Sequence, residues 1–212
     1  VNKNCVSNQC SLKYQNELRD ELLSNPNSIT IIGSRLPVYL TGTAFDNKEG
    51  GIEIHEGFKF EFKHIKDEYD FRKGIQVSII ELLENNNKVI LMYPIPAVGW
   101  NVPNKLFHDT PKRYIKEIKK NFNENPITTS YKVYKERTKE SFEIYNQIQH
   151  KNIYRVYPHT VFCNNKIKDR CVTHDDKNIF YYDDDHLSSA GSAMVIDLIM
   201  KQIKKIELEL NQ

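Results

Sequence analysis

Three short apolar runs, separated by helical patterns, limit the possible folds of this 212-residue chain more than any other feature. The runs span residues 29–33, 88–93 and 152–157 and are rich in Ile, Val, Leu and Tyr, which is typical of strands buried on both faces. Strands that alternate with helices are joined by right-handed crossovers. The sequence therefore predicts an α/β fold with a parallel sheet that is covered by helices on both faces.

Helical patterns fill most of the remaining chain. Apolar residues recur at helical spacing in four segments, at residues 12–24, 75–84, around 130–149 and in a long last helix that Ser188 or Ser189 caps. Its Met and Ile residues, Ile196 among them, are expected in the core. Pro111 marks the start of a further helix, and the glycines of residues 34–57 predict a loop. Length and hydrophobic content fit one domain over residues 1–212.

Ligands of open parallel sheets bind outside the carboxyl ends of the strands. The segments that follow Gly33, Tyr93 and Tyr157 are therefore expected at the site, together with the approach to the last helix at residues 181–191. Trp100 lies on the expected rim, where it can stack on a sugar ring or pack into the core.

Charge and hydropathy argue against several partners. The net charge of +2 gives no support for a nucleic-acid ligand. Residues 112–139 are locally basic, which fits a solvated helical face or attraction to an anionic glycan or membrane surface. No apolar run is long enough to span a bilayer, and the chain starts without Met or a signal-peptide core. We expect it to be part of a longer protein.

The four cysteines form two close pairs, Cys5 with Cys10 and Cys163 with Cys171. Neither pair has the two-residue gap of zinc knuckles or thioredoxin-like motifs. The spacing favours two small disulfide loops in an oxidising compartment, although other pairings and reduced buried thiols remain open.

The segment Asp183-Asp184-Asp185-His186 carries the strongest chemical signal. Asp183 precedes His186 by one tight turn, so its carboxylate can reach an imidazole nitrogen, fix the tautomer and support a general base. This segment has two alternative interpretations. The acids can simply favour the start of a helix, or they can form a binding site for a hard metal ion. The metal site is the weaker of these, because alternating ligand spacing and a following Gly are absent.

In context, the segment Tyr182-Asp183-Asp184-Asp185-His186-Leu187-Ser188-Ser189-Ala190-Gly191 resembles the last block of SGNH hydrolases. It is most similar to the SGNH domain fused to acyltransferase-3 membrane proteins that O-acetylate bacterial surface polysaccharides. The resemblance extends upstream through three stretches, residues 31–40, 45–51 and 93–103. It implies a three-layer α/β/α sandwich of the SGNH or flavodoxin-like type.

The resemblance also implies roles for individual residues. Asp183 would orient His186, which would act as general base and then general acid. The family carries its serine in a Gly-Asp-Ser motif on a first strand, and this chain contains no such motif. We expect that strand upstream of Val1, so that the domain is truncated at its N-terminus, and Ser34 is a weaker candidate nucleophile.

Gly33 and Arg35 follow the first apolar run and are candidates to hold the developing oxyanion, through a backbone N–H and a charged donor. A salt bridge is the alternative role of Arg35.

The implied function is that of an extracytoplasmic O-acyltransferase domain. A membrane acyltransferase region outside this chain would anchor it and deliver the acyl donor, a polysaccharide or lipopolysaccharide would be the acceptor, and no cofactor or metal is expected. A carbohydrate esterase and a catalytically inactive glycan-binding module are the alternatives.

Overall fold

The computed structural model describes residues 12–53, 71–107 and 122–211. Its central sheet has three parallel strands in the order β1-β2-β4, with Ile31 beside Ile90 and Leu91 beside Arg155. The strands span Ile29–Gly33 (β1), Lys88–Met92 (β2) and Ile153–Val156 (β4). The three predicted strands are confirmed, two of them slightly shorter than expected.

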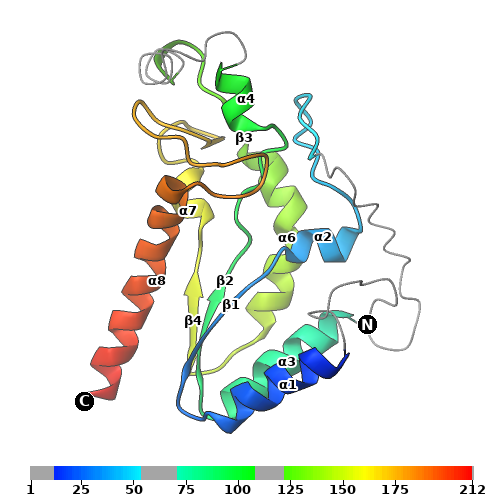
Figure 1. Ribbon diagram of the computed structural model, residues 1–212, viewed down its shortest axis with the longest axis vertical. Coiled ribbons are helices and arrows are strands. Elements are labelled where there is room, and N and C mark those ends of the chain that lie inside the picture. The colour runs from blue at the N-terminus through cyan, green and yellow to red at the C-terminus, as the bar shows by residue number, and fades with distance from the viewer. Residues whose placement is uncertain (1–11, 54–70, 108–121, 212) are drawn as a thin grey trace.

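Helices cover both faces of the sheet (Figure 1). On one face, Ile206 of α8 packs against Ile90, Tyr154 and Val156. On the other face, helices α1, α3 and α6 pack over Val89 and Leu91. The bounds are Leu12–Ser24 (α1), Phe71–Glu84 (α3), Tyr131–Gln147 (α6) and Ser189–Leu210 (α8). The predicted α/β class, with a parallel sheet between helices, is confirmed.

The strands differ in how completely they are covered. The side chains of Val89, Ile90 and Leu91 in β2 are fully buried. In β1, at the edge of this sheet, Ile29 and Ile31 are 39% and 49% exposed. Because α8 contacts β4 and β2, it leaves this part of the β1 face open.

The described part of the segment predicted as a loop, residues 34–53, is not simply a loop. A short helix, α2 (Leu36–Thr41), follows β1, with a proline in its first turn and Gly42 at its end. Gly42 has a φ of 65°, which glycine adopts readily, and its N–H bonds the carbonyl of Val38. The loop prediction was wrong over Leu36–Thr41. The glycines of the segment favoured a loop, whereas a proline in the first turn and a glycine just past the end are together typical of a helix.

Four further short elements were not predicted. They are α4 (Val102–Phe107), α7 (His159–Phe162) and the antiparallel strands β3 (Thr128–Ser130) and β5 (Arg170–Val172). The helix expected at Pro111 lies outside the described residues. The prediction for the last helix holds for Ile206 but was wrong for Ile196, which is 53% exposed.

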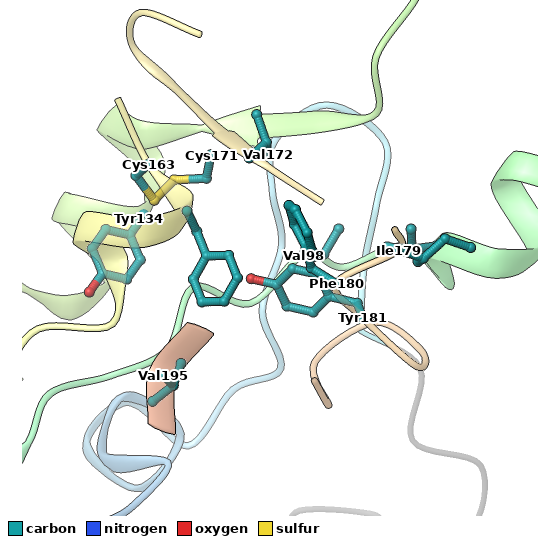
Figure 2. Close-up of a cluster of buried hydrophobic side chains, with 11 residues drawn as sticks. Val98, Tyr134, Cys163, Cys171, Val172, Ile179, Phe180, Tyr181 and Val195 are labelled. Atoms are coloured by element: carbon teal, nitrogen blue, oxygen red, sulfur yellow. A yellow bond between two sulfur atoms is a disulfide. The ribbon is translucent and has the colours of Figure 1, made fainter. Parts of the chain in front are cut away.

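A second core lies at the end of the molecule to which the carboxyl ends of the strands point. Figure 2 shows Val98, Phe180, Tyr181 and Val195 gathered there with other buried side chains. These residues come from the segment after β2, the approach to α8 and α8 itself. This core therefore fixes the segments that were expected to carry the site.

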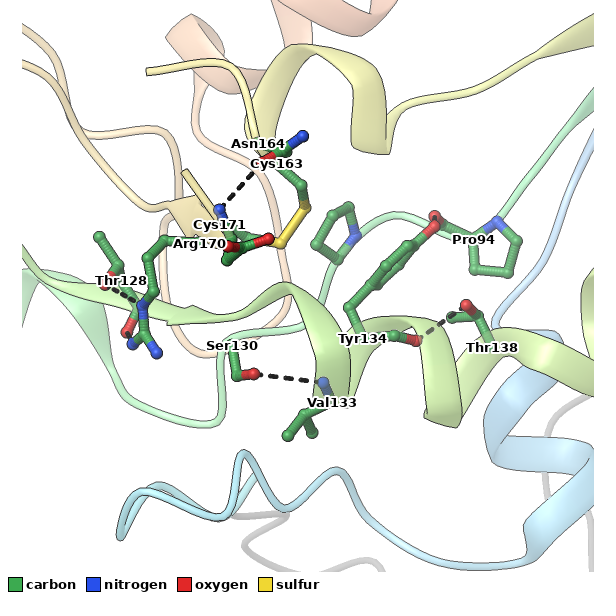
Figure 3. Close-up of a disulfide and its surroundings, with 12 residues drawn as sticks. Pro94, Thr128, Ser130, Val133, Tyr134, Thr138, Cys163, Asn164, Arg170 and Cys171 are labelled. Carbon is green, nitrogen blue, oxygen red and sulfur yellow. Dashed lines mark hydrogen bonds between the residues drawn. A yellow bond between two sulfur atoms is a disulfide. The ribbon is translucent and has the colours of Figure 1, made fainter. Parts of the chain in front are cut away.

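A disulfide joins Cys163, directly after α7, to Cys171 in β5. The backbone N–H of Asn164 also bonds the carbonyl of Arg170 at 2.7 Å, beside the disulfide (Figure 3). The predicted pairing of these two cysteines is confirmed, whereas Cys5 and Cys10 lie outside the described residues. Across the described ranges, no helix combines the length and the apolar character that a membrane span requires.

Candidate active site

The candidate site is a closed turn over residues 181–187, directly before α8. Tyr181 and Leu187 form an antiparallel bridge, and the Tyr182 N–H bonds the carbonyl of His186 at 2.7 Å. The buried Tyr181 donates its hydroxyl to the carbonyl of Pro96 at 2.7 Å. The turn is therefore pinned both across its own ends and to the segment that follows β2.

The start of α8 closes the base of this turn. Ser188 is the N-cap: its Oγ accepts the Gly191 N–H at 3.2 Å, and its own N–H bonds the carbonyl of Phe180 at 2.9 Å. A Cβ atom at Gly191 would collide with that same carbonyl oxygen. The absence of a side chain at Gly191 therefore lets the helix start lie against Phe180. Of the two predicted caps, Ser188 and Ser189, the structure has Ser188.

Backbone hydrogen bonds hold the turn at the carboxyl end of β2. The carbonyl of Asp184 accepts the N–H groups of Val98 and Gly99 at 2.9 and 3.1 Å. The carbonyl of Asp183 accepts the N–H of Val102 at 3.2 Å. Asp183 and His186 thus belong to a turn held against the segment that follows β2, which is one of the segments expected at the site.

Asp183 contacts His186 as its spacing predicted. Its Oδ1 accepts the backbone N–H groups of Asp185 and His186 at 3.0 and 2.7 Å, and its Oδ2 lies 2.9 Å from Nδ1 of His186. Partial burial alone would raise the pKa of Asp183, but the two backbone donors and the imidazole outweigh it, so the pKa lies below its usual value. Asp183 is thereby kept as a charged acceptor beside Nδ1.

A second carboxylate, which the sequence analysis did not assign, reaches the same nitrogen. Oδ1 of Asp185 lies 2.9 Å from Nδ1 of His186, and its Oδ2 lies 2.9 Å from Nη1 of Arg35. The side chain of Asp185 is only 8% exposed. Burial raises its pKa, against the opposing effects of Arg35 and His186.

Arg35 joins this group to the segment after α2. Its guanidinium bonds the buried carboxylate of Glu53 as well as Asp185. Glu53 in turn accepts the backbone N–H of Phe45 at 3.0 Å. These ion pairs agree with the alternative role of Arg35 as a salt-bridge residue, and its role as an oxyanion donor stays a prediction.

The imidazole of His186 presents its other nitrogen outward. The side chain is 68% exposed, and Nε2 has no hydrogen-bond partner among the residues that the structure describes. With Nδ1–H donated to a carboxylate, Nε2 carries the lone pair and can accept a proton. The arrangement can therefore serve as a general base toward a group brought to this face.

Ser34 and Gly33 lie at the end of β1. The exposed Ser34 shares a hydrogen bond with the hydroxyl of Tyr145, at 3.2 Å, rather than with His186. A Cβ atom at Gly33 would meet the side chain of Met92. The part of either residue in catalysis remains a prediction.

Trp100, the predicted rim residue, and two asparagines near it shape the segment after β2. Trp100 packs against the second core, with Lys105 4.2 Å above its ring. Oδ1 of Asn101 accepts the N–H of Asn104 at 3.0 Å, at the start of α4. The buried Asn47 donates to the carbonyl of Val98 at 2.9 Å and so ties its own loop to the same segment. Core packing is thus the observed role of Trp100.

Asp183, Asp185 and His186 also offer three potential ligand atoms within 4.8 Å of one another. However, the Arg35 guanidinium already pairs with Asp185 and would repel a second cation there. Hydrogen bonds hold Asp183 and His186, and ion pairs hold Asp185. The arrangement thus offers a poor metal site, and its acid–base role stays a prediction.

The fold and this pair define the class: a parallel α/β domain with a carboxylate-supported histidine at the carboxyl ends of its strands. Over residues 2–201 the chain matches the family model of the SGNH domain (fused to AT3 domains), and it belongs to that family. AT3 denotes the acyltransferase-3 domain. The predicted family is confirmed.

Among solved structures, the chain is similar to the periplasmic domain of a lipopolysaccharide acetyltransferase from Salmonella ser. Paratyphi A. The identity is 14% and the TM-score 0.49, and the match covers 90% of this chain and 62% of the other. The chain thus spans less than two thirds of that solved domain. No curated protein matches it.

Proposed function

We propose that this chain is the extracytoplasmic SGNH domain of an O-acyltransferase that modifies surface polysaccharide or lipopolysaccharide. Membership of a family of SGNH domains fused to AT3 domains supports the acyltransferase role. A membrane acyltransferase region would supply the acyl donor and the anchor. The single observation that carries the proposal is the geometry of His186, whose Nδ1 is held by Asp183 at 2.9 Å while its side chain is exposed.

The nucleophile in this proposal is a serine of a Gly-Asp-Ser segment upstream of Val1. Nε2 of His186 takes the proton of the serine hydroxyl as its oxygen attacks the acetyl carbonyl of the donor. The bond to the donor oxygen then breaks, and His186 gives the proton to that leaving oxygen. An acetyl-serine remains.

In the second half of the cycle a sugar hydroxyl attacks the acetyl-serine. His186 removes the proton of this hydroxyl and returns it to the serine oxygen as the ester bond breaks. The product is the O-acetylated glycan, and the serine is regenerated. If water attacks instead, the same residues act as an esterase.

The test compares the intact membrane protein that contains this chain with its His186→Ala variant, in membranes supplied with an acyl donor and a polysaccharide acceptor. We expect acetyl groups on the glycan with the parent and almost none with the variant. Release of free acetate without acetylated glycan would favour the esterase.

One observation favours a second candidate, a glycan-binding module without catalysis. Ser34, the candidate nucleophile within this chain, bonds Tyr145 rather than His186. This candidate predicts glycan binding that His186→Ala leaves unchanged, with neither transfer nor release of acetate by the intact protein.

A further inference from the structure

Nδ1 of His186 faces two carboxylates at the same distance. Oδ2 of Asp183 and Oδ1 of Asp185 each lie 2.9 Å away. A neutral imidazole has a single N–H to give at this nitrogen. A triad of the usual kind needs one acceptor there, so the second requires an explanation.

The two carboxylates are held by different means. Asp183 is fixed inside the turn, because its Oδ1 accepts two backbone N–H groups of that turn. Asp185 is fixed from outside, because its Oδ2 pairs with Nη1 of Arg35 at 2.9 Å. Asp185 therefore holds its position only as long as Arg35 does.

Arg35 has its own anchor. It pairs with Glu53, whose side chain is 0% exposed and whose other oxygen accepts the Phe45 N–H at 3.0 Å. The chain of contacts Glu53, Arg35, Asp185 and His186 thus joins the loop after α2, the start of α2 and the turn before α8. These are segments from nearly opposite ends of the sequence.

Charge explains why the arginine is needed. Carboxylate oxygens of Asp183 and Asp185 both lie 2.9 Å from Nδ1 of His186, and like charges this close repel each other. Asp184 in the same turn and the buried Glu53 add further negative charge. The Arg35 guanidinium binds two of these carboxylates and offsets the repulsion.

We propose that Asp185 and Arg35 are positioning residues for His186, with Arg35 acting through Asp185. A single hydrogen bond at Nδ1 leaves the ring of an exposed histidine free to tilt, because its outer torsion has a broad energy well. The hydrogen bond to Asp183 and the charge of Asp185, 2.9 Å from the same nitrogen, together restrict that tilt and aim Nε2 in one direction. The catalytic consequence rests on the proposed function, whereas the ring geometry does not.

The first test is spectroscopic and uses this chain with ¹⁵N-labelled histidine. In the parent we expect one dominant His186 tautomer, protonated on Nδ1, with a downfield proton that exchanges slowly with water. Arg35→Gln and Asp185→Asn should each broaden that proton and speed its exchange.

Arg170→Gln is the matched control, because Arg170 pairs with Glu49 in a comparable half-buried site beside β3. It should leave the His186 signals unchanged. Signals unchanged in both Arg35→Gln and Asp185→Asn would overturn the proposal whatever the protein catalyses. If Arg35→Gln does not fold, Arg35→Lys and Asp185→Asn decide the question.

The second test uses the intact protein and acetyl transfer. Each variant should lower kcat by roughly two- to hundredfold with little change in KM, and the double variant should be no slower than the slower single variant. Multiplicative losses would contradict action through Asp185. If the parent itself transfers no acetyl group, the proposed function fails, and the spectroscopic result still decides the positioning role.

Discussion

The turn at residues 181–187 and the end of β1 at residues 33–35 both lie at the carboxyl edge of the sheet, but their side chains are used differently. In the turn, Asp183 supports an imidazole whose outer nitrogen is exposed. At the end of β1, Ser34 bonds Tyr145, and Arg35 is occupied by two carboxylates. The comparison teaches that polar residues near one sheet edge can have different roles: the turn leaves an imidazole nitrogen exposed, whereas the polar side chains at the end of β1 are occupied by contacts within the protein.

The largest expected effect is that of His186→Ala. Loss of the general base should lower acetyl transfer by the intact protein by about 10²–10⁴-fold. Because the side chain is exposed, the free energy of unfolding should change by no more than about 0.5 kcal/mol. His150→Ala, at an exposed position before β4, is the control and should keep full activity. Full transfer by His186→Ala would remove the turn from the mechanism.

Asp183→Asn should have the next largest effect. Asparagine can still accept the two backbone N–H groups, so the turn should stay folded, but it loses the charge that stabilises an imidazolium. We expect kcat to fall on the order of a hundredfold. Asp184→Asn alters the charge of the same turn, and an equal loss there would show that net charge matters more than the contact with Nδ1.

The pH dependence of stability should separate the two regions as well. The pKa of Asp183 is lowered by folding, so its contribution is fully present above the ordinary carboxyl value and is lost as the pH falls through the lower folded value. Urea unfolding between about pH 5 and pH 3 should therefore show a shallower loss for Asp183→Asn than for the parent. Ser34→Ala removes no ionisable group and should keep the parent's slope.

Asp185 should affect the pH dependence of stability in the opposite direction. Folding raises its pKa, so ionised Asp185 costs stability as the pH rises through that raised value. Relative to the parent, Asp185→Asn should gain stability over this interval, in the same unfolding series. If Asp183→Asn and Asp185→Asn changed in stability with pH in the same way, the different anchoring of the two carboxylates would be contradicted.

The smallest expected effect is that of Ser34→Ala on activity. Removing its hydroxyl breaks one hydrogen bond to Tyr145, which contributes about 0.5–1.5 kcal/mol, and should change acetyl transfer less than about twofold. A loss as large as that of His186→Ala would make Ser34 the nucleophile and would reverse the comparison between the two regions.

Local sequence signals predicted the parts of the fold that local interactions determine. The apolar runs around Ile31, Ile90 and Tyr154 identified all three strands of the parallel sheet. Elements α2, α4 and α7 were missed because four to six residues are too short to show a helical period. Strands β3 and β5 are shorter still, and their pairing joins distant segments.

The same distinction applies to the site. Asp183 was found because its partner is three residues away and one turn brings them together. Asp185 was not assigned, because its contact with Arg35 depends on how α2 packs beside the turn. Nothing in the spacing of the acids around His186 distinguishes a carboxylate that an arginine holds from one that faces water.

Substitutions of Gly191 should disturb the site although this residue is not part of it. Any side chain at this position would push the start of α8 away from Phe180, where the closed turn begins. Under the proposed function, a genetic screen for loss of surface acylation is expected to recover substitutions at Gly191. Such alleles would resemble substitutions of His186 in phenotype, although residue 191 lies outside the turn that carries His186.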